Sequence, residues 1–198
     1  MQMTRRGFGK MTSLFLLGLT TTLNVFLAGC GVFSDILTWI PIGLTAIQGI
    51  VTVLGPLVSP GAAAIIALIK VAFSDLSATI TQYQNDTNTA DKATLLAKIR
   101  TILNDIVTNF QNFLDQLNIG SNPIEAIVIG LANVTLAAIA GFIGQLPVPA
   151  GGVTLTTSFR LSGKSMTIVP KFYKRVGDFR KDYNAVCVAD GYPQIQIK

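Results

Sequence analysis

The sequence contains no histidine, only two cysteines and a single tryptophan, and only 13% of its 198 residues are charged. Without histidine the chain lacks the commonest general base and metal ligand, which excludes Ser-His and Cys-His nucleophile pairs and histidine-containing zinc sites. Half of the residues are hydrophobic, and low charge with high apolarity is the opposite of the composition of disordered chains. We therefore expect a folded, non-enzymatic protein that needs no cofactor.

Residues 1–29 have the three parts of an export signal, namely a basic start, an uncharged apolar stretch and small residues before Cys30. The segment Thr4-Arg5-Arg6-Gly7-Phe8-Gly9-Lys10 resembles the twin-arginine translocation signal, Ser/Thr-Arg-Arg-x-Phe-Leu-Lys, with Gly9 in place of the leucine. The positions that carry the resemblance are Arg5, Arg6, Phe8 and Lys10. It implies export of a chain that has already folded. The alternative is an ordinary secretory signal with two chance arginines.

The segment Leu27-Ala28-Gly29-Cys30 resembles the lipobox of bacterial lipoproteins, in which the cysteine thiol receives a diacylglycerol and the cysteine becomes the mature N-terminus. Each buried CH₂ of an acyl chain such as palmitate contributes about 0.8 kcal/mol, so two or three chains anchor a protein stably. Gly31 after the cysteine is typical of delivery to the outer membrane where a bacterium has two membranes. The alternative is a signal-anchor helix with a chance Leu-Ala-Gly-Cys. No family resemblance extends beyond Gly31.

Four segments after the cysteine combine helical periodicity with helix-capping residues. The expected helices cover residues 36–54, 60–83, 91–118 and 123–145. Ser34 and Asp35 are candidate caps of the first helix, and Pro41 is expected to end or kink its first turn. Short connections favour antiparallel neighbours, so we expect a mainly α fold built as a four-helix up-down bundle.

The middle two expected helices each carry one apolar stripe. In the second helix the stripe is Ile65, Ile69, Phe73, Leu76, Ile80 and Tyr83. In the third helix it is Leu95, Ile99, Ile102, Ile106, Phe110, Phe113 and Leu117. The opposite face of the third helix is charged and polar, so this helix has one side in water and cannot span a membrane.

The first and fourth expected helices are apolar nearly all round and long enough to cross a bilayer. In the fourth, Ala137 and Gly141, and likewise Ala140 and Gly144, fit the small-xxx-small pattern of close helix contacts. This pattern suits either the centre of a bundle or a membrane-embedded helix. The surplus apolar surface requires a cover, which is the C-terminal segment, another copy, bound lipid or the bilayer.

After a Pro- and Gly-containing linker at 147–152 the period changes to two, which predicts a short β-hairpin. Its strands are expected to end at Leu161 and to resume at Met166–Val169, with Ser162-Gly163-Lys164-Ser165 as the loop. A basic tail follows. From Val153 to Lys198 there are eight basic and three acidic residues, against four basic and seven acidic residues from Cys30 to Gly152.

Aromatic residues lie among the cations of this tail. The cations expected to contact an anionic surface are Lys171, Lys174, Arg175, Arg180 and Lys181. An exported lipoprotein rarely meets nucleic acid, so anionic lipid headgroups or acidic envelope polymers are the expected partners. The alternative is a solvated surface that keeps an apolar protein soluble.

Other residues suggest chemistry only weakly. The loop segment from Ser162 to Ser165 resembles the end of a P-loop, but Ser158 stands where the first glycine belongs. Asp178, Asp182 and Asp190 are interleaved with Lys and Arg and are expected to be ion-pair partners, not metal ligands. Cys187 is expected to be a buried core thiol, with an intermolecular disulfide or redox sensing as alternatives. Trp39 and Phe33 belong either to the membrane interface or to the core.

The sequence thus predicts a signal peptide over 1–29, a lipidated tether over 30–33, an apolar helical bundle over 34–146 and a basic β or irregular segment over 153–198. The expected protein is a lipoprotein of a bacterial cell envelope, anchored through Cys30, with a structural or interaction role. Its expected partners are the membrane and either its own copies or an envelope protein, with no nucleic acid. One alternative is a carrier of lipid or another apolar molecule, and a second is a membrane-embedded or pore-like protein.

Overall fold

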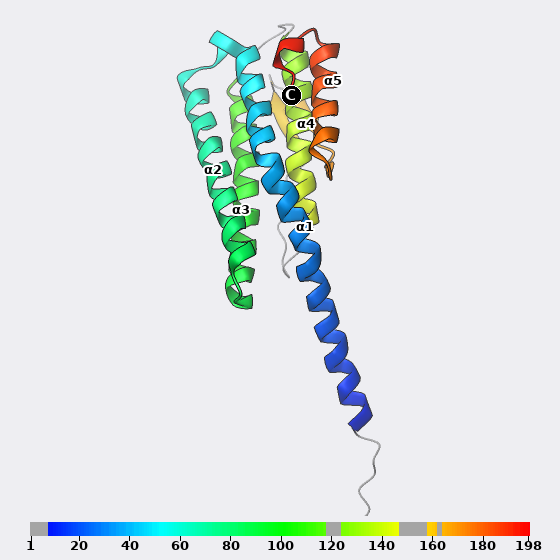
Figure 1. Cartoon of the computed structure of the whole chain (residues 1–198). Coiled ribbons are helices and arrows are strands. Elements are labelled where there is room, and N and C mark those ends of the chain that lie inside the picture. The colour runs from blue at the N-terminus through cyan, green and yellow to red at the C-terminus, as the bar shows by residue number, and fades with distance from the viewer. Residues whose placement is uncertain (1–7, 118–123, 147–157, 162–163) are drawn as a thin grey trace, which may run out of the picture.

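The computed structural model describes residues 8–117, 124–146, 158–161 and 164–198, and the fold is mainly helical (Figure 1). Side chains are described for residues 31–55, 57–117, 124–146 and 165–198. The helices are α1 (Phe8–Leu54), α2 (Pro60–Asn85), α3 (Thr89–Asp115), α4 (Ile124–Gln145) and α5 (Val176–Ala189). Two short 3-10 helices, η1 (Gly55–Leu57) and η2 (Pro193–Ile195), and two strands, β1 (Ser158–Leu161) and β2 (Lys164–Thr167), complete the described elements.

The helix α1 differs from the expectation at its start. It is continuous through Ser34 and Asp35, which therefore lie inside the helix and do not cap it, and Pro41 neither ends nor restarts it. Pro41 lies on the exposed face. Proline has no amide hydrogen, so Pro41 cannot donate the usual helical hydrogen bond to the Leu37 carbonyl. Because this face of the helix is exposed, water can hydrogen-bond to that carbonyl instead, and the helix continues through the proline.

Capping side chains fix the ends of α2 and α3. The Ser59 hydroxyl accepts a hydrogen bond from the Ala62 amide (3.1 Å), directly before Pro60 in the first turn of α2. In the turn between α2 and α3 the Asn88 amide donates to the Asp86 carboxylate (2.7 Å), and the Asn88 side chain accepts from the Ala90 amide (3.0 Å). These caps satisfy amides that have no partner within the helix, which is why the helices start there.

The predicted apolar stripes form the core. Only the first member of each stripe, Ile65 and Leu95, is half-buried, and every other member is buried, including Leu117 just beyond the end of α3. Trp39 and Phe33 are also fully buried, which supports the core interpretation of both. The Trp39 ring lies 5.4–5.9 Å from the rings of Phe73, Phe142 and Phe179, centroid to centroid, and so joins α1, α2, α4 and α5.

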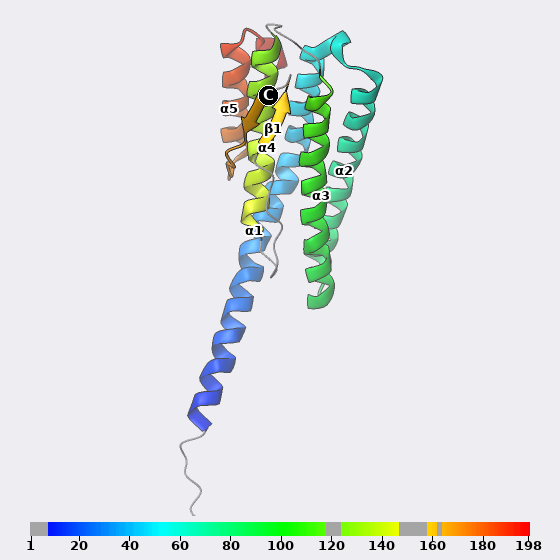
Figure 2. The same cartoon turned by 180° about the vertical axis from the view of Figure 1, so that it is seen from behind.

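The helices form two groups that share α1. On one side α2 and α3 pack along each other, and on the other α4 packs against α5, with α1 in contact with both α2 and α4 (Figures 1 and 2). Consecutive helices from α1 to α4 run in alternating directions in Figure 1. The buried Arg100 of α3 donates a hydrogen bond to the Leu146 carbonyl, just beyond α4 (2.6 Å). Its positive charge therefore lies at the negative, C-terminal end of the α4 dipole, where a cation is favourable.

The C-terminal region departs most from the sequence prediction, because it contains a fifth helix. Phe179, Tyr183 and Cys187 recur every four residues in α5 and are its buried side chains. The strands β1 and β2 pair antiparallel with Leu161 opposite Lys164. Lys164 and Ser165 therefore belong to a strand and not to the expected loop, and this strand ends at Thr167 instead of Val169.

The surplus apolar surface of α4 is covered within the chain itself. Helices α1, α3 and α5 contact α4, and the chain that leads from β2 into α5 runs along it, with the Lys171 amide donating to the Ala137 carbonyl (2.9 Å). Of the four covers that the sequence left open, the structure contains the first, the C-terminal segment. Five large apolar side chains remain exposed among the described residues, namely Leu57, Leu68, Val71, Val169 and Val188.

Candidate functional site

The predicted anchoring residue lies one helical turn before the packed core. Cys30 and the lipobox positions Leu27, Ala28 and Gly29 fall within α1, and their side chains lie outside the described ones, as do those of Phe8 and Lys10. Arg5 and Arg6 lie outside the described residues. Phe33, three positions after the cysteine, is fully buried against the Tyr83 ring, with centroids 4.4 Å apart. An acyl group on Cys30 would therefore be joined to the core by almost no free chain.

The basic side chains of the C-terminal region lie in different environments. Lys174, Arg175 and Lys181 are exposed, and Arg180 is half-buried with its Nε atom buried and without a hydrogen-bond partner among the described residues. Lys171 pairs with Asp182 and lies over the Tyr173 ring, with its Nζ atom 5.0 Å from the centroid. Three of the five predicted cations are thus exposed and form no salt bridge with another described side chain. Lys171, by contrast, forms a salt bridge with Asp182.

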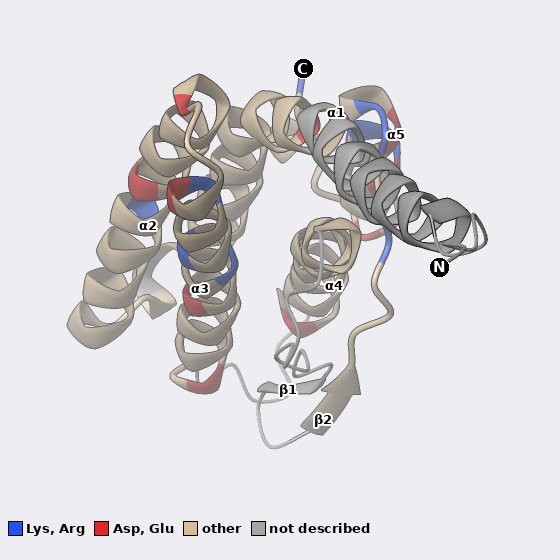
Figure 3. Cartoon of the chain, turned by 90° about the horizontal axis from the view of Figure 1, so that it is seen from below, with Lys and Arg blue, Asp and Glu red and all other residues tan. Residues whose placement is uncertain are grey.

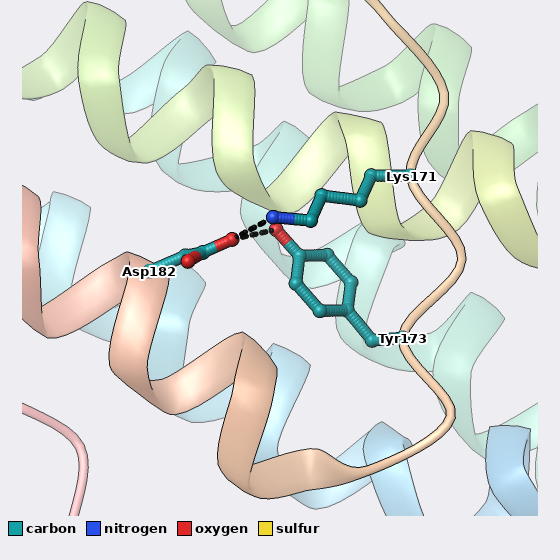
Figure 4. A network of polar contacts seen from close by, with 3 residues as sticks. All are labelled: Lys171, Tyr173 and Asp182. Carbon is teal, nitrogen blue, oxygen red and sulfur yellow. Dashed lines mark hydrogen bonds and ion pairs between the residues drawn. The ribbon is translucent and has the colours of Figure 1, made fainter.

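Lys171, Tyr173 and Asp182 form a polar network where the chain leading into α5 meets that helix (Figure 4). The Lys171 ammonium and the Tyr173 hydroxyl both donate to Oδ2 of Asp182, the latter at 2.8 Å. Burial alone would raise the pKa of Asp182, but the two hydrogen bonds and the charges of Lys171 and Lys181 hold that pKa below its usual value. Burial and the nearby Asp182 carboxylate raise the pKa of Tyr173, so its hydroxyl stays protonated and donates.

A pocket of about 370 Å³ opens beside this network, between α4 and the chain that follows β2. Its lining residues are Asn133, Val134, Ala137, Thr167, Val169, Pro170, Lys171, Tyr173 and Asp182. Its lining combines the apolar residues Val134, Val169 and Pro170 with a small set of polar residues, a combination that is usual in small-molecule sites. The sequence predicted Asp182 as an ion-pair partner of nearby cations and Lys171 as a contact for an anionic surface, but it did not place the two residues together. It missed the pocket because Asn133 and Thr167 lie on other elements.

A second pocket, of about 530 Å³, lies at the turn between α2 and α3. Its lining residues are Thr81, Gln82, Asn85, Asp86, Asp91, Thr94 and Leu95. Asp86 already accepts a hydrogen bond from the Asn88 amide. In the part of the chain that the structure describes, no three His, Cys, Asp or Glu residues are grouped so as to hold a metal ion.

The small residues of α4 have two different surroundings. A Cβ atom at Gly141 would overlap the backbone of Lys171 and Phe172, whereas a Cβ at Gly144 would meet nothing within 4 Å. Gly130 lies against Val186 of α5, and a Cβ atom added to Gly130 would lie 2.6 Å from the Val186 Cγ1 atom. The small-xxx-small pattern suggested another helix as the neighbour of Gly141, but the close approach is to the non-helical chain between β2 and α5.

The remaining candidate residues are structural. Cys187 is fully buried, and burial raises the pKa of its thiol to about 11, which supports the core-thiol interpretation. Asp182 forms an ion pair, as expected, and its partner is Lys171. Asp178 and Asp190, for which ion pairs were also expected, have none within the described side chains. Ser162 and Gly163 lie outside the described residues, and Lys164 and Ser165 lie in β2, which is not the strand-to-helix turn that a P-loop requires.

Three helical segments are long and apolar enough to cross a membrane by length and composition, namely Gly31–Leu54, Pro60–Asn85 and Ile124–Gln145. Their mean hydropathy values are 1.7, 1.8 and 2.3, and 39%, 33% and 67% of the respective windows are buried in the structure. No family model, curated protein or solved structure matches the chain.

Proposed function

We propose that the mature protein is a non-enzymatic lipoprotein of a bacterial cell envelope, anchored through acyl chains on Cys30, whose helical body stands outside the bilayer and contacts other envelope components. The observation that carries this proposal is the pattern of burial in α1. The residues of α1 that the body leaves exposed after Gly31 are Ser34, Thr38, Pro41, Thr45, Gln48 and Thr52. A helix with this outer face has its apolar side covered by its own protein and needs no lipid around it.

The body in this proposal is an up-down bundle of α1 to α4, widened by α5 and the paired strands. Its buried apolar residues continue from Phe33 to Ile197, the last residue but one, which is 5% exposed. Such a body is a rigid spacer with chemically distinct faces. Figure 3 shows that much of the charge on the described residues lies on α3, on α5 and in the chain that leads into α5.

The proposed contact surface for anionic partners consists of Lys174, Arg175 and Lys181, hereafter the basic patch. All three are exposed, and they lie just before and within the first half of α5. Headgroups of anionic lipids or acidic polymers of the envelope fit this chemistry, and each cation near an anionic surface contributes about 1 kcal/mol. Lys171 and Arg180 are left out because the first is paired with Asp182 and the second is half-buried.

Two observations favour other functions. The 370 Å³ pocket beside Tyr173, with its apolar wall, favours a carrier of a small apolar molecule. The outer face of α2, where Leu68 and Val71 are 56% and 58% exposed, favours a membrane-embedded protein. Against the second, the same helix carries the exposed charges of Lys70 and Asp75 near its middle. These charges would be expensive within a bilayer.

Lipidation and location are tested separately, on the full chain expressed in a bacterium. Labelled palmitate should be incorporated into the native chain and into Cys187→Ala, but not into Cys30→Ala. Location is tested by replacing residues 1–30 with an ordinary signal peptide that is cleaved before Gly31. The released body should then leave the membrane fraction in high salt. A body that stays with the membrane and requires detergent would contradict the proposal in favour of embedded helices.

A further inference from the structure

We propose that the pocket between α4 and the chain that follows β2 binds a neutral sugar. Its volume of about 370 Å³ lies within the range of about 300–1,000 Å³ that is usual for small-molecule sites. The polar residues of the site that would contact the sugar are Asn133, Thr167, Lys171 and Asp182. The inference does not depend on the proposed anchoring of the chain to a membrane.

The polar side of this pocket is held in place by the protein itself. The Lys171 amide donates to the Ala137 carbonyl (2.9 Å), and the Lys171 backbone lies against Gly141, so this part of the chain is fixed on α4. The hydroxyl of Tyr173, a residue only 5% exposed, donates to the Asp182 carboxylate (2.8 Å) and orients it. A ligand that meets groups already ordered loses less conformational entropy on binding.

These polar residues have hydrogen-bonding capacity that the described part of the protein does not use. Lys171 and Tyr173 both donate to Oδ2 of Asp182 (Figure 4), and no described residue donates to Oδ1. The Lys171 ammonium has three hydrogens and uses one of them on Asp182. The side chains of Asn133 and Thr167 make no hydrogen bond with another described residue. A molecule in the pocket would therefore meet both donors and acceptors.

The charges at the site favour a neutral ligand. Lys171 and Asp182 form an ion pair, so their charges largely cancel where a ligand would lie. An anion would compete with Asp182 for the ammonium, and a cation would compete with Lys171 for the carboxylate. A hydroxyl group can accept from Lys171 or donate to Asp182 without breaking their pair, because it is both a donor and an acceptor.

The apolar wall of the pocket fits the ring of a sugar, which presents C–H groups on its faces and hydroxyl groups at its edge. The wall is formed by Val134, Ala137, Val169 and Pro170. A wholly apolar ligand would cover Asn133 and Asp182 without replacing their hydrogen bonds to water, which is unfavourable. A sugar satisfies both the wall and the polar groups, so it fits this pocket better than an apolar molecule.

Ligand-detected NMR on the full-length chain, kept in a detergent that contains no sugar, tests this inference. The probes are neutral hexoses, their N-acetylamino forms and 6-deoxyhexoses. At least one probe should bind with a Kd in the low millimolar range, as expected for a ligand of about 12 non-hydrogen atoms. If none of these sugars bound to the native chain, the inference would be wrong.

Asn133→Ala tests whether a bound sugar lies in the pocket. Its matched control is Asn109→Ala, because Asn109 of α3 is also half-buried on a helix and does not line the pocket. Loss of one hydrogen bond should raise the Kd about three- to tenfold in Asn133→Ala, whereas Asn109→Ala should leave the Kd unchanged. Equal Kd values for the two variants would place the sugar elsewhere and overturn the inference. Circular dichroism checks that both variants are folded.

Thr167→Val tests whether the ligand is recognised through its hydroxyl groups. The substitution replaces the hydroxyl of an exposed residue at the end of β2 by a methyl group of nearly the same size. Sugar binding should weaken about three- to tenfold, because one hydrogen bond is lost. An apolar ligand would bind this variant at least as well as the native chain. Sugar binding that was unchanged or stronger in Thr167→Val would therefore overturn the inference.

Salt separates this inference from the proposed function. Binding of a neutral sugar should be equal in low and high salt, and it should be unchanged in Lys174→Gln, whereas contact of the basic patch with an anionic surface should weaken as salt screens the charges. Sugar binding that fell with salt would overturn the neutral ligand. Sugar binding by a chain that incorporates no palmitate would overturn the anchoring and leave this inference in place.

Discussion

The backbone of Lys171 lies so close to Gly141 that the Cβ atom of any larger residue at position 141 would overlap the Lys171 carbonyl group. One turn earlier on α4, the Ala137 carbonyl accepts a hydrogen bond from the Lys171 amide. These two contacts hold the chain that leads into α5 directly on the surface of α4. They also hold Lys171 where its ammonium group reaches Asp182.

Gly141→Ala should therefore destabilise the protein. The added methyl group meets backbone atoms, which cannot rotate away, and overpacking of this kind costs about 1–3 kcal/mol. Gly144→Ala is the matched control on the same helix, since it meets nothing within 4 Å and should stabilise the helix by about 0.5–1 kcal/mol. Urea unfolding of both variants measures the difference. If Gly141→Ala and Gly144→Ala were equally stable, the segment that leads into α5 would not pack against Gly141 as the structure has it.

The Asp182 carboxylate should make the stability depend on pH. Its folded pKa lies below the unfolded value of about 3.9, so its contribution is fully present above about pH 4 and is lost as the pH falls through the folded pKa. Asp182→Asn should cost about 1 kcal/mol at neutral pH, because the Lys171 ion pair is partly exposed to water. The variant should also lose less stability than the native chain on acidification.

The control for this prediction is Asp178→Asn, one helical turn earlier in α5. Asp178 is exposed and has no ion pair among the described side chains, so its replacement should change neutral-pH stability by less than about 0.5 kcal/mol. Unfolding curves of both variants at neutral and acid pH give the comparison. If Asp178→Asn lowered the stability as much as Asp182→Asn, the network of Lys171, Tyr173 and Asp182 would not be the cause of the effect.

The thiol of Cys187 should be unreactive in the folded protein. With a pKa of about 11, about one thiol in a thousand is ionised at pH 8, and the side chain is fully buried. A thiol reagent should label Cys187 only after denaturant is added. Rapid labelling under native conditions would show that α5 leaves the body readily and would revive redox sensing as a role for this residue.

The single tryptophan should report directly on the core. Trp39 is 1% exposed and surrounded by three phenylalanine rings, so its fluorescence should be blue-shifted and poorly quenched by acrylamide in the native protein. Unfolding should shift the emission to the red in one transition that coincides with the loss of helical circular dichroism. Strong quenching of the native protein would place Trp39 at a surface and contradict this core.

The sequence by itself determined most of the helices and their inner faces. Helical periodicity and caps are local properties, so the stripe from Ile69 to Tyr83 and the start of α2 after Ser59 could be predicted from neighbouring residues. The fifth helix was also within reach of the sequence, because Phe179, Tyr183 and Cys187 have helical spacing. It is not among the expected helices because the basic residues between these positions also fit a charged tail.

Only the tertiary structure decided what covers the apolar helices and which polar groups meet. The Tyr183 hydroxyl donates to the Ala46 carbonyl (2.9 Å) across 137 positions of sequence, and Arg100 reaches Leu146 across 46. Local periodicity shows that a face is buried but not against what. That choice depends on how the whole chain covers its apolar surface, and here the C-terminal segment covers α4.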